Sequence, residues 1–369
     1  MGDFTRKEII LRIQKGTKPL NFSGTDFGCL DLSGLDFSNC NLEAAKFNET
    51  NIDKLDLTSS TLSKYGFVNS LGKPLIVNTT IENFKIIDSN KSDFKIVKSN
   101  FNEVLINSES EFIIIDSKLN SCRFELVKNL KLNKSIIKDS VFEKTNSYIE
   151  LKECELQKSY INLNGKEIIS LTIDSCVFLI SGIGYMGSKL KPQFYHNEFY
   201  GDTMNENIWE GGTISSNSFT EFEFIRLKAT RTSFENNKFM KTHIFGSGFD
   251  DFDDLKFCEN TFTEGNLNLN FNSCRVFDNK FSAAKIKLNF KDSEVYNNIF
   301  NDCEISKIVT DTIIKDCNFE KVKFENCDFR IKGILENCLF KDCEFENCLG
   351  VENIKVEKDK KSILNRLGM

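Results

Sequence analysis

Few side chains of this protein could act in catalysis or ligand binding, and the densest group of them is acidic. Asp250, Asp251, Asp253 and Asp254 fall within five consecutive positions. Grouped carboxylates can bind calcium, but the alternating ligands and closing Glu of a calcium-binding loop are missing here. Carboxylates in a groove can also cleave polysaccharides, and an acidic loop can contact a protein. We expect a solvated loop, and we keep the four aspartates as candidate partner-binding residues.

The other reactive side chains form no catalytic constellation. The chain has two histidines, His196 and His243, and nothing in it resembles a Ser-His-Asp, Cys-His or zinc triad. We therefore predict that the protein is not an enzyme and has no catalytic residue, no cofactor and no metal. The single tryptophan, Trp209, is a candidate partner anchor, because aromatic residues dominate binding hot spots.

Two further patterns look functional at first sight. Cys338, Cys343 and Cys348 are five residues apart, whereas structural zinc sites use short Cys-x-x-Cys loops. We expect the 13 cysteines to be reduced and most of them to act as small buried residues.

Residues 182–187 read Gly-x-Gly-x-x-Gly, but no helix that could hold a phosphate is predicted after them. We expect a protruding loop there.

Apolar residues recur every five positions between Phe22 and Phe67, and this period indicates the architecture that holds the side chains above. A period of five fits neither a helix, which repeats every 3.6 residues, nor a half-buried strand, which repeats every 2. Four such steps can close one square turn of a coil that stacks on the next turn, as in solenoid proteins. The residue before each apolar position is mostly Asp or Asn. The apolar positions are Phe22, Phe27, Leu32, Phe37, Leu42, Phe47, Ile52, Leu57, Leu62 and Phe67.

This stretch resembles the pentapeptide repeat, in which a small residue, Asp or Asn, and Leu or Phe precede two variable positions. The match is specific over residues 20–67 and looser over the rest of the chain. The resemblance implies a right-handed quadrilateral β-helix with Leu or Phe and the small residue pointing inward. We therefore predict an all-β fold, a parallel β-helix with about 20 residues per coil and a short N-terminal capping helix.

The second half of the chain repeats at the length of a whole coil. Phenylalanines recur about every 20 residues from Phe199 to Phe340, and most have Asn two positions earlier. Inward Asn side chains at this spacing would hydrogen-bond from coil to coil, which offsets the cost of burying them. The predicted Asn ladder consists of Asn197, Asn217, Asn237, Asn260, Asn279 and Asn298.

The pattern divides the chain into five segments. Thr5 and Glu8 form a capping box at the start of a helix, so residues 1–19 are expected to cap the first coil. A first β-helix segment follows over 20–179, with lapses at Lys91 and Glu111 and no clear register between about 107 and 180. We expect an irregular glycine-rich interruption over 180–215, a second β-helix segment over 216–350, and a C-terminal cap or tail over 351–369.

Composition sets limits on the partners. The net charge of −6 gives no basic patch for direct nucleic-acid binding. Neither a secretory leader nor an apolar run of about 18 residues is found, so we expect a cytoplasmic protein without membrane contact, and delivery as an effector stays open.

The leading functional hypothesis is a non-catalytic scaffold that binds another protein. The family resemblance also implies an alternative, since some members imitate duplex DNA and bind DNA gyrase. Such mimicry requires dense, regularly spaced negative charge, which residues 1–70 lack. A second alternative is a carbohydrate-active β-helix enzyme, which would need carboxylates in a groove near aromatic residues. A homodimer through one end of the solenoid is also open.

Overall fold

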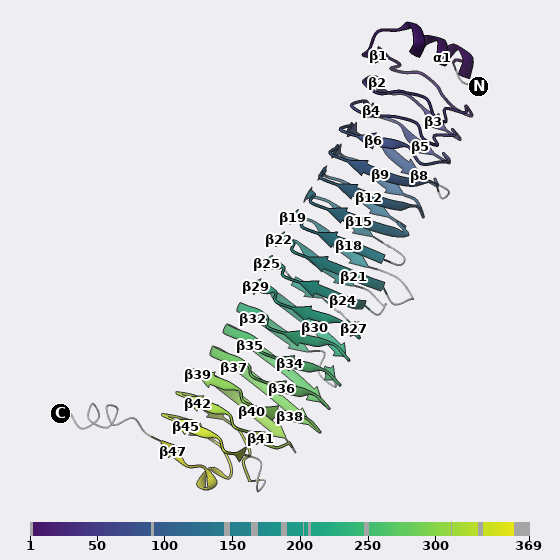
Figure 1. The fold of residues 1–369 in the computed structure, drawn as a ribbon. Helices are drawn as coiled ribbons and strands as arrows, with labels where there is room; N and C mark the ends of the chain where they lie inside the picture. Colours follow the sequence, from purple (N-terminus) through teal and green to yellow (C-terminus); the bar gives the residue numbers. More distant parts are fainter. Residues whose placement is uncertain are drawn as a thin grey trace, which may run out of the picture. The chain divides into compact units, whose positions relative to one another are not determined.

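The structure is a computed structural model of two compact units, residues 1–188 and residues 189–369, which we describe separately. It describes residues 3–89, 92–143, 148–163, 169–185, 190–201, 203–205, 208–246, 251–310, 312–330 and 335–357. Within each unit, strands pair in parallel with strands one coil further along, and the described residues contain one α-helix (Figure 1). The predicted parallel β-helix with a short N-terminal helix is confirmed.

Unit 1 begins with helix α1 (Arg6–Lys15), which starts at the predicted capping box. The Thr5 hydroxyl accepts a hydrogen bond from the Glu8 N–H at 3.3 Å, and the Glu8 carboxylate accepts one from the Thr5 N–H at 2.7 Å. Ile9 is the buried residue of the helix. In Figure 1 the helix lies beside strand β1 (Leu20–Asn21), at the start of the first coil.

The strands of unit 1 form three stacked walls. The first wall consists of β1, β2 (Cys40–Glu43), β4 (Thr61–Ser63), β7 (Thr80–Glu82), β10 (Asn100–Asn102), β13 (Lys118–Asn120), β16 (Ile136–Lys138), β19 (Glu155–Gln157) and β22 (Val177–Leu179). The second consists of β3 (Phe47–Asn48), β5 (Gly66–Val68), β8 (Lys85–Ile87), β11 (Leu105–Asn107), β14 (Arg123–Glu125), β17 (Val141–Glu143), β20 (Tyr160–Leu163) and β23 (Gly182–Tyr185). The third consists of β6 (Leu75–Val77), β9 (Asp93–Val97), β12 (Glu111–Ile115), β15 (Asn129–Asn133), β18 (Tyr148–Lys152) and β21 (Ile169–Asp174).

The Asp or Asn before each apolar residue has a local structural role at the corners of the first coils. The Asp26 Oδ1 accepts a hydrogen bond from the Gly28 N–H at 2.8 Å, and the Asn51 Oδ1 accepts one from the Asp53 N–H at 3.1 Å. These Asx turns precede a residue in the left-handed region, such as Lys54 with φ 57°. The apolar residues themselves point inward and are buried. The five-residue pattern therefore encodes one corner per repeat.

The lapses in the five-residue count, and the unclear register after about residue 107, have a simple cause. In β9 the side chains of Phe94 and Ile96 are both buried, which is the period-2 alternation of a strand rather than a corner every five residues. One longer wall replaces two short ones, and the coil shortens to 18 residues, as the pairing of Asn100 with Lys118 shows. Phe112 likewise points inward next to Glu111, where the five-residue count lapsed.

Each coil of unit 2 has four sides, but several strands run without a break from the second side into the third, so we group its strands into three walls. Some strands also run from the first wall into the second. The first wall consists of β25 (Glu198–Tyr200), β29 (Ser218–Thr220), β32 (Lys238–Gly246), β35 (Thr261–Asn272), β37 (Lys280–Lys291), β39 (Ile299–Asn301), β42 (Asn318–Glu320), β45 (Leu339–Lys341) and β47 (Val356–Glu357). The second includes β32, β35 and β37 again, with β26 (Thr203–Asn205), β27 (Ile208–Glu210), β30 (Glu223–Thr230), β33 (Phe252–Asp253), β40 (Glu304–Thr310), β43 (Lys323–Glu325) and β46 (Glu344–Glu346). The third consists of β24 (Leu190–Tyr195), β28 (Thr213–Ser215), β31 (Ser233–Glu235), β34 (Lys256–Cys258), β36 (Arg275–Phe277), β38 (Glu294–Tyr296), β41 (Ile314–Lys315) and β44 (Leu335–Glu336).

The core of unit 2 contains the predicted Asn ladder. All six asparagines are at most 2% exposed. The Asn237 Oδ1 accepts hydrogen bonds from the Asn217 N–H and Nδ2, both at 3.0 Å, and the Asn260 Oδ1 accepts the same pair from Asn237. Phenylalanine rings stack beside the ladder, with centroids 4.8 Å apart for Phe281 and Phe300. The inward Asn side chains thus satisfy one another from coil to coil.

Residues 180–215 contain strands of the regular pattern rather than a structureless break, as far as they are described. In unit 1, β23 pairs in parallel with β20, and in unit 2, β24 pairs with β28. The division into two units falls inside this segment, between residues 188 and 189. Gly182 and Gly184 belong to β23, whereas the third glycine of the motif, Gly187, lies outside the described residues. Of the predicted C-terminal cap, the short 3₁₀ helix η1 (Val351–Asn353) and β47 are described.

Candidate functional site

The structure places Trp209 in the core of unit 2. Its side chain is 0% exposed, and its ring stacks on Phe234 at 5.6 Å and meets Phe194 edge-on at 5.9 Å. The indole Nε1 has no hydrogen-bond partner. The hypothesis of a partner anchor is therefore wrong, because a fully buried ring cannot contact another protein. The lone tryptophan fills an inward position that phenylalanine occupies elsewhere.

The four aspartates do not share one environment. Asp250 lies outside the described residues. Asp251 is 1% exposed, and its Oδ2 accepts hydrogen bonds from the Asn270 N–H at 3.1 Å and from the Asn270 Nδ2 at 2.8 Å. Asp253 is half-buried, and Asp254 is exposed at a corner. The expectation of a solvated loop is wrong for Asp251, which serves the packing of unit 2.

The histidines and cysteines also take structural positions. His196 is exposed at a corner with φ 56°, and His243 is half-buried, with its ring 6.1 Å from that of Phe245. Nine of the 13 cysteines are buried, and all are free thiols. Burial raises the pKa of the Cys274 thiol to about 12, so this group stays protonated at neutral pH. Within the described ranges, no three His, Cys, Asp or Glu side chains are grouped so that they could hold a metal.

The strongest candidate for a functional site is a groove on unit 1 that sequence reasoning missed. It has a volume of about 530 Å³ and lies where the coil changes from short walls to the longer third wall. We call it the Leu75 groove. Its lining residues are Lys54, Lys73, Pro74, Leu75, Asp93, Phe94, Lys95, Glu111 and Ile113.

Three neighbouring strands position the floor of the groove. Leu75 of β6 pairs with Lys95 of β9, which pairs in turn with Ile113 of β12. These side chains form an outward column, about 4.8 Å from one strand to the next. Leu75 is 45% exposed, whereas Phe94, which points the other way, is 1% exposed. The floor therefore offers two aliphatic side chains, those of Leu75 and Ile113, with Lys95 between them.

The rim of the groove carries both signs of charge. The Lys73 Nζ lies 2.6 Å from the Asp93 Oδ2. The hydrogen bond to Asp93 raises the pKa of Lys73, and the charges of Asp93, Glu111 and Asp53 add to this effect. Lys54 and Lys95 form no ion pair with any described residue. The groove thus combines an apolar floor with two ammonium groups that a partner could engage.

Gly72 makes the wide corner beside the groove possible. Its φ of 116° is a conformation that favours glycine, and a Cβ at this position would lie 2.4 Å from the Asp53 Cα. The sequence feature that marks this corner is the spacing of nine positions from Phe67 to Ile76 in place of five or ten, and Gly72 and Pro74 lie between the two residues. A gap in a strict repeat predicts an irregular corner, but not whether the side chains around it form a groove.

A protein-family model described as pentapeptide repeats matches residues 21–63 in eight copies. This chain contains pentapeptide repeats. They build the first coils of unit 1, from β1 to β4, next to the Leu75 groove. No curated protein matches the chain. No helix in the described ranges is long and apolar enough to span a membrane.

Several solved structures are similar to this chain. HetL, a pentapeptide repeat protein of the cyanobacterium Nostoc involved in heterocyst differentiation regulation, is 10% identical (TM-score 0.25; 61% of this chain and 96% of HetL covered). QnrB1, a plasmid-mediated fluoroquinolone resistance protein, is 14% identical (TM-score 0.22; 69% and 97% covered). A mannuronic acid-specific polysaccharide lyase from the human gut microbiota is 9% identical (TM-score 0.29; 99% and 92% covered).

Proposed function

We propose that this protein is a non-catalytic scaffold and that the Leu75 groove binds a protein partner. The observation that carries the proposal is the outward column in which exposed Leu75 and half-buried Ile113 lie on either side of Lys95, beside a charged rim. Partner sites on proteins typically combine a desolvated apolar centre with a polar rim. Pentapeptide repeats supply the rigid support, because each coil is held by its neighbours on both sides.

The partner we propose has an apolar side chain at the centre of its contact surface and carboxylates beside it. The apolar group would cover Leu75, and the carboxylates would pair with Lys54 and Lys95. Burying charge without a partner is costly, so a basic or uncharged rim on the partner would bind less well. The ion pair between Lys73 and Asp93 stays within the groove and fixes its wall.

DNA mimicry is less well supported. A DNA mimic needs a continuous row of negative charge along its coils. In unit 1 the stacked acidic residues Asp36 and Asp56 are followed by Leu75 and then by Lys95. We therefore keep DNA gyrase only as one identity to look for among captured partners.

A carbohydrate-active enzyme has one observation in its favour. Asp93 and Glu111 lie on paired positions of β9 and β12 within the groove, and glycoside-cleaving sites use two carboxylates. Asp93, however, is bound to the Lys73 ammonium group at 2.6 Å. The aromatic residue of the groove, Phe94, is buried and offers no ring face to a sugar.

The test is an affinity capture from extract of the source cells with three purified proteins. The natural chain and Ile136→Asp should retain the same protein, and Leu75→Asp should retain at least about tenfold less of it, as expected for a hot-spot residue. Ile136 is the matched control, because it is an exposed aliphatic residue of unit 1 (44% against 45% for Leu75) that does not line the groove.

Equal capture by all three proteins would show that the groove is not the binding site. If all three also released oligosaccharides from a panel of polysaccharides, and Asp93→Asn and Glu111→Gln abolished that release, the enzyme alternative would replace the scaffold. Circular dichroism of each variant checks that the fold is intact.

A further inference from the structure

The first coil of unit 1 forms the edge of its parallel sheets. Along this edge, the backbone N–H and C=O groups of successive residues point alternately toward the second coil and away from it. In a parallel ladder, successive residues direct their N–H and C=O groups to opposite sides of the strand. The Phe22 N–H donates to the Asn41 C=O in the second coil at 2.8 Å. The backbone groups of Asn21, one residue earlier, therefore point away from the second coil. Asp26 has the same position on the next wall, because the Phe27 N–H also donates into the second coil.

The N-terminal segment covers this edge on two walls. The Asp26 N–H donates to the Asp3 carboxylate at 2.7 Å, and the Asp26 C=O accepts from the Asp3 N–H at 2.8 Å. On the following wall the Arg6 guanidinium donates to the C=O of Asp31 and, at 2.8 Å, to the C=O of Ser33. An exposed strand edge is a site for pairing with another chain, and these contacts block it.

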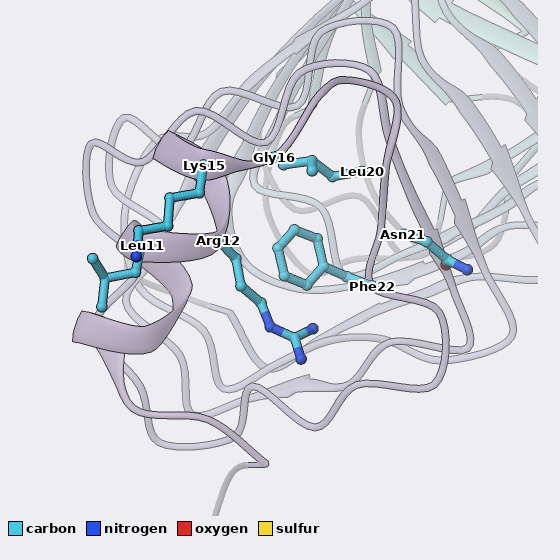
Figure 2. Close-up of a pocket in the computed structure, with 7 residues that line it drawn as sticks. All are labelled: Leu11, Arg12, Lys15, Gly16, Leu20, Asn21 and Phe22. Atoms are coloured by element: carbon cyan, nitrogen blue, oxygen red, sulfur yellow. The ribbon is translucent and has the colours of Figure 1, made fainter.

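At Asn21 the edge is uncovered. Within the described ranges, neither the N–H nor the C=O of Asn21 has a hydrogen-bond partner, and the residue is exposed. A pocket of about 420 Å³ lies directly beside it, between α1 and β1 (Figure 2). The pocket is lined by Leu11, Arg12, Lys15, Gly16, Leu20, Asn21 and Phe22.

The chemistry of this pocket is apolar on one side and cationic on the other. Figure 2 shows the Phe22 ring and Leu20 on the strand side, with Arg12 and Lys15 on the helix side. Arg12 packs its guanidinium over the Phe4 ring at 4.1 Å, and neither cation forms an ion pair with a described residue. The exposed edge of β1 therefore lies on one side of the pocket, and the two unpaired cations of α1 lie on the other side.

We propose that this end of unit 1 binds an extended acidic segment of a partner protein by β-augmentation. A strand of the partner would pair with the Asn21 N–H and C=O, and one apolar side chain would enter the pocket against Phe22. A Glu or Asp two positions along would meet Arg12 and Lys15, because alternate side chains of a strand share one face. A second copy of this chain is a poorer occupant, since it would bring the same two cations to the contact. The proposal does not depend on the Leu75 groove.

The test uses fluorescence polarisation with the full chain and a labelled seven-residue peptide with Val at position 3, Glu at positions 1, 5 and 7, and Thr at positions 2, 4 and 6. This pattern puts the apolar side chain and the carboxylates two positions from it on one face of the peptide strand. Binding is expected to weaken at least tenfold in Asn21→Pro, which removes the N–H. Proline is tolerated where an edge-strand N–H faces solvent. Asn21→Ala is the matched control, because it removes the side chain that accepts from the Ser23 N–H but keeps the backbone donor. The double variant Arg12→Gln, Lys15→Gln should also bind at least tenfold more weakly.

The remaining outcomes decide against the proposal. A peptide with Lys in place of Glu that binds equally well would show that the cations play no part. Equal binding by Asn21→Pro and Asn21→Ala would exclude the edge, and no binding at 1 mM peptide would exclude the site. If light scattering finds a dimer that Asn21→Pro dissociates and Asn21→Ala does not, the occupant of the edge is a second copy of the chain.

Discussion

The two units fill the same inward position with different polar residues. Unit 1 mostly uses serine: the Ser117 Oγ accepts from the Ser99 N–H at 3.1 Å and donates to the Ile115 C=O at 2.8 Å. Unit 2 uses asparagine: the Asn237 Oδ1 accepts two hydrogen bonds from Asn217, and its Nδ2 donates to the Ile214 C=O at 2.8 Å. A serine therefore bonds one donor of the coil before it, whereas an asparagine bonds two.

This difference shows that a solenoid can vary the strength of the hydrogen bonding between its coils without changing its backbone. In both units the inward position must satisfy an N–H of the coil before it, because a buried donor without a partner is costly. The longer asparagine side chain adds an amide that bonds the amide of the next coil. We infer that the coils of the Asn ladder in unit 2 are held more strongly than those of the Ser ladder in unit 1.

The largest expected effect comes from breaking the Asn ladder at its middle. Asn237→Ala removes the acceptor that the Asn217 N–H and Nδ2 share. The Asn217 Nδ2 still donates to the C=O of Phe194 and of Ser215, but the Asn217 N–H is left without this acceptor. We expect a loss of about 3 kcal/mol in the free energy of unfolding of unit 2. One buried unsatisfied donor costs roughly 1–3 kcal/mol, and the lost hydrogen bonds of the Asn237 side chain add to this cost. Fluorescence of Trp209, which is buried in unit 2 and is the only tryptophan, reports the transition in urea. An unchanged midpoint would contradict the role given to the ladder.

The matching change in unit 1 should be smaller. Ser117→Ala removes the hydroxyl group that accepts a hydrogen bond from the Ser99 N–H and donates one to the Ile115 C=O. We expect a loss of about 1 kcal/mol. Hydrogen exchange of peptides within residues 99–133 measures it, and the Trp209 transition should not move. A loss as large as that of Asn237→Ala would remove the difference between the ladders.

The smallest expected effect concerns the N-terminal cap, which belongs to unit 1. The hydrogen bond from Lys18, at 2.6 Å, and then that from Ser38 lower the pKa of Asp36 from 3.8 to about 2. A lowered pKa in the folded state means that the ionised carboxylate stabilises the fold. This contribution is complete above about pH 4 and is lost as the pH falls through about 2.

We expect residues 3–18 to exchange hydrogen faster at pH 2.5 than at pH 5, after correction for intrinsic rates. The loss should be a few tenths of a kcal/mol, because the pair is largely exposed. Asp36→Asn should show the faster exchange already at pH 5. If the variant and the natural chain exchange alike at pH 5, the ion pair does not hold the cap.

The parts of this fold that follow a strict local rule could be predicted from the sequence. The coils of residues 20–67 follow from one corner every five residues, and the Asn ladder follows from the constant distance between each Asn and its Phe. The register between about 107 and 180 could not be found, because strands such as β12, in which Phe112 and Ile114 are both buried, follow a period of two in a coil of 18 residues. Trp209 and Asp251 were misplaced because their burial depends on partners about 20 residues away, such as Ala229 and Asn270.

The Leu75 groove was missed for a related reason. Its floor consists of residues from three coils, and their adjacency depends on where the coil length changes from 20 to 18. Without the register at that point, the sequence does not show that Leu75, Lys95 and Ile113 form one column. The N-terminal cap was predicted from its capping box, but the contacts of Asp3 and Arg6 with the first coil were not.

Hydrogen exchange of the complex with the captured partner shows whether the Leu75 groove binds that protein. We predict slower exchange in peptides that cover residues 71–77, 93–97 and 111–115, with no change in residues 136–143 around the control position Ile136. Protection confined to other walls of unit 1, or to unit 2, with the groove unchanged, would contradict this prediction.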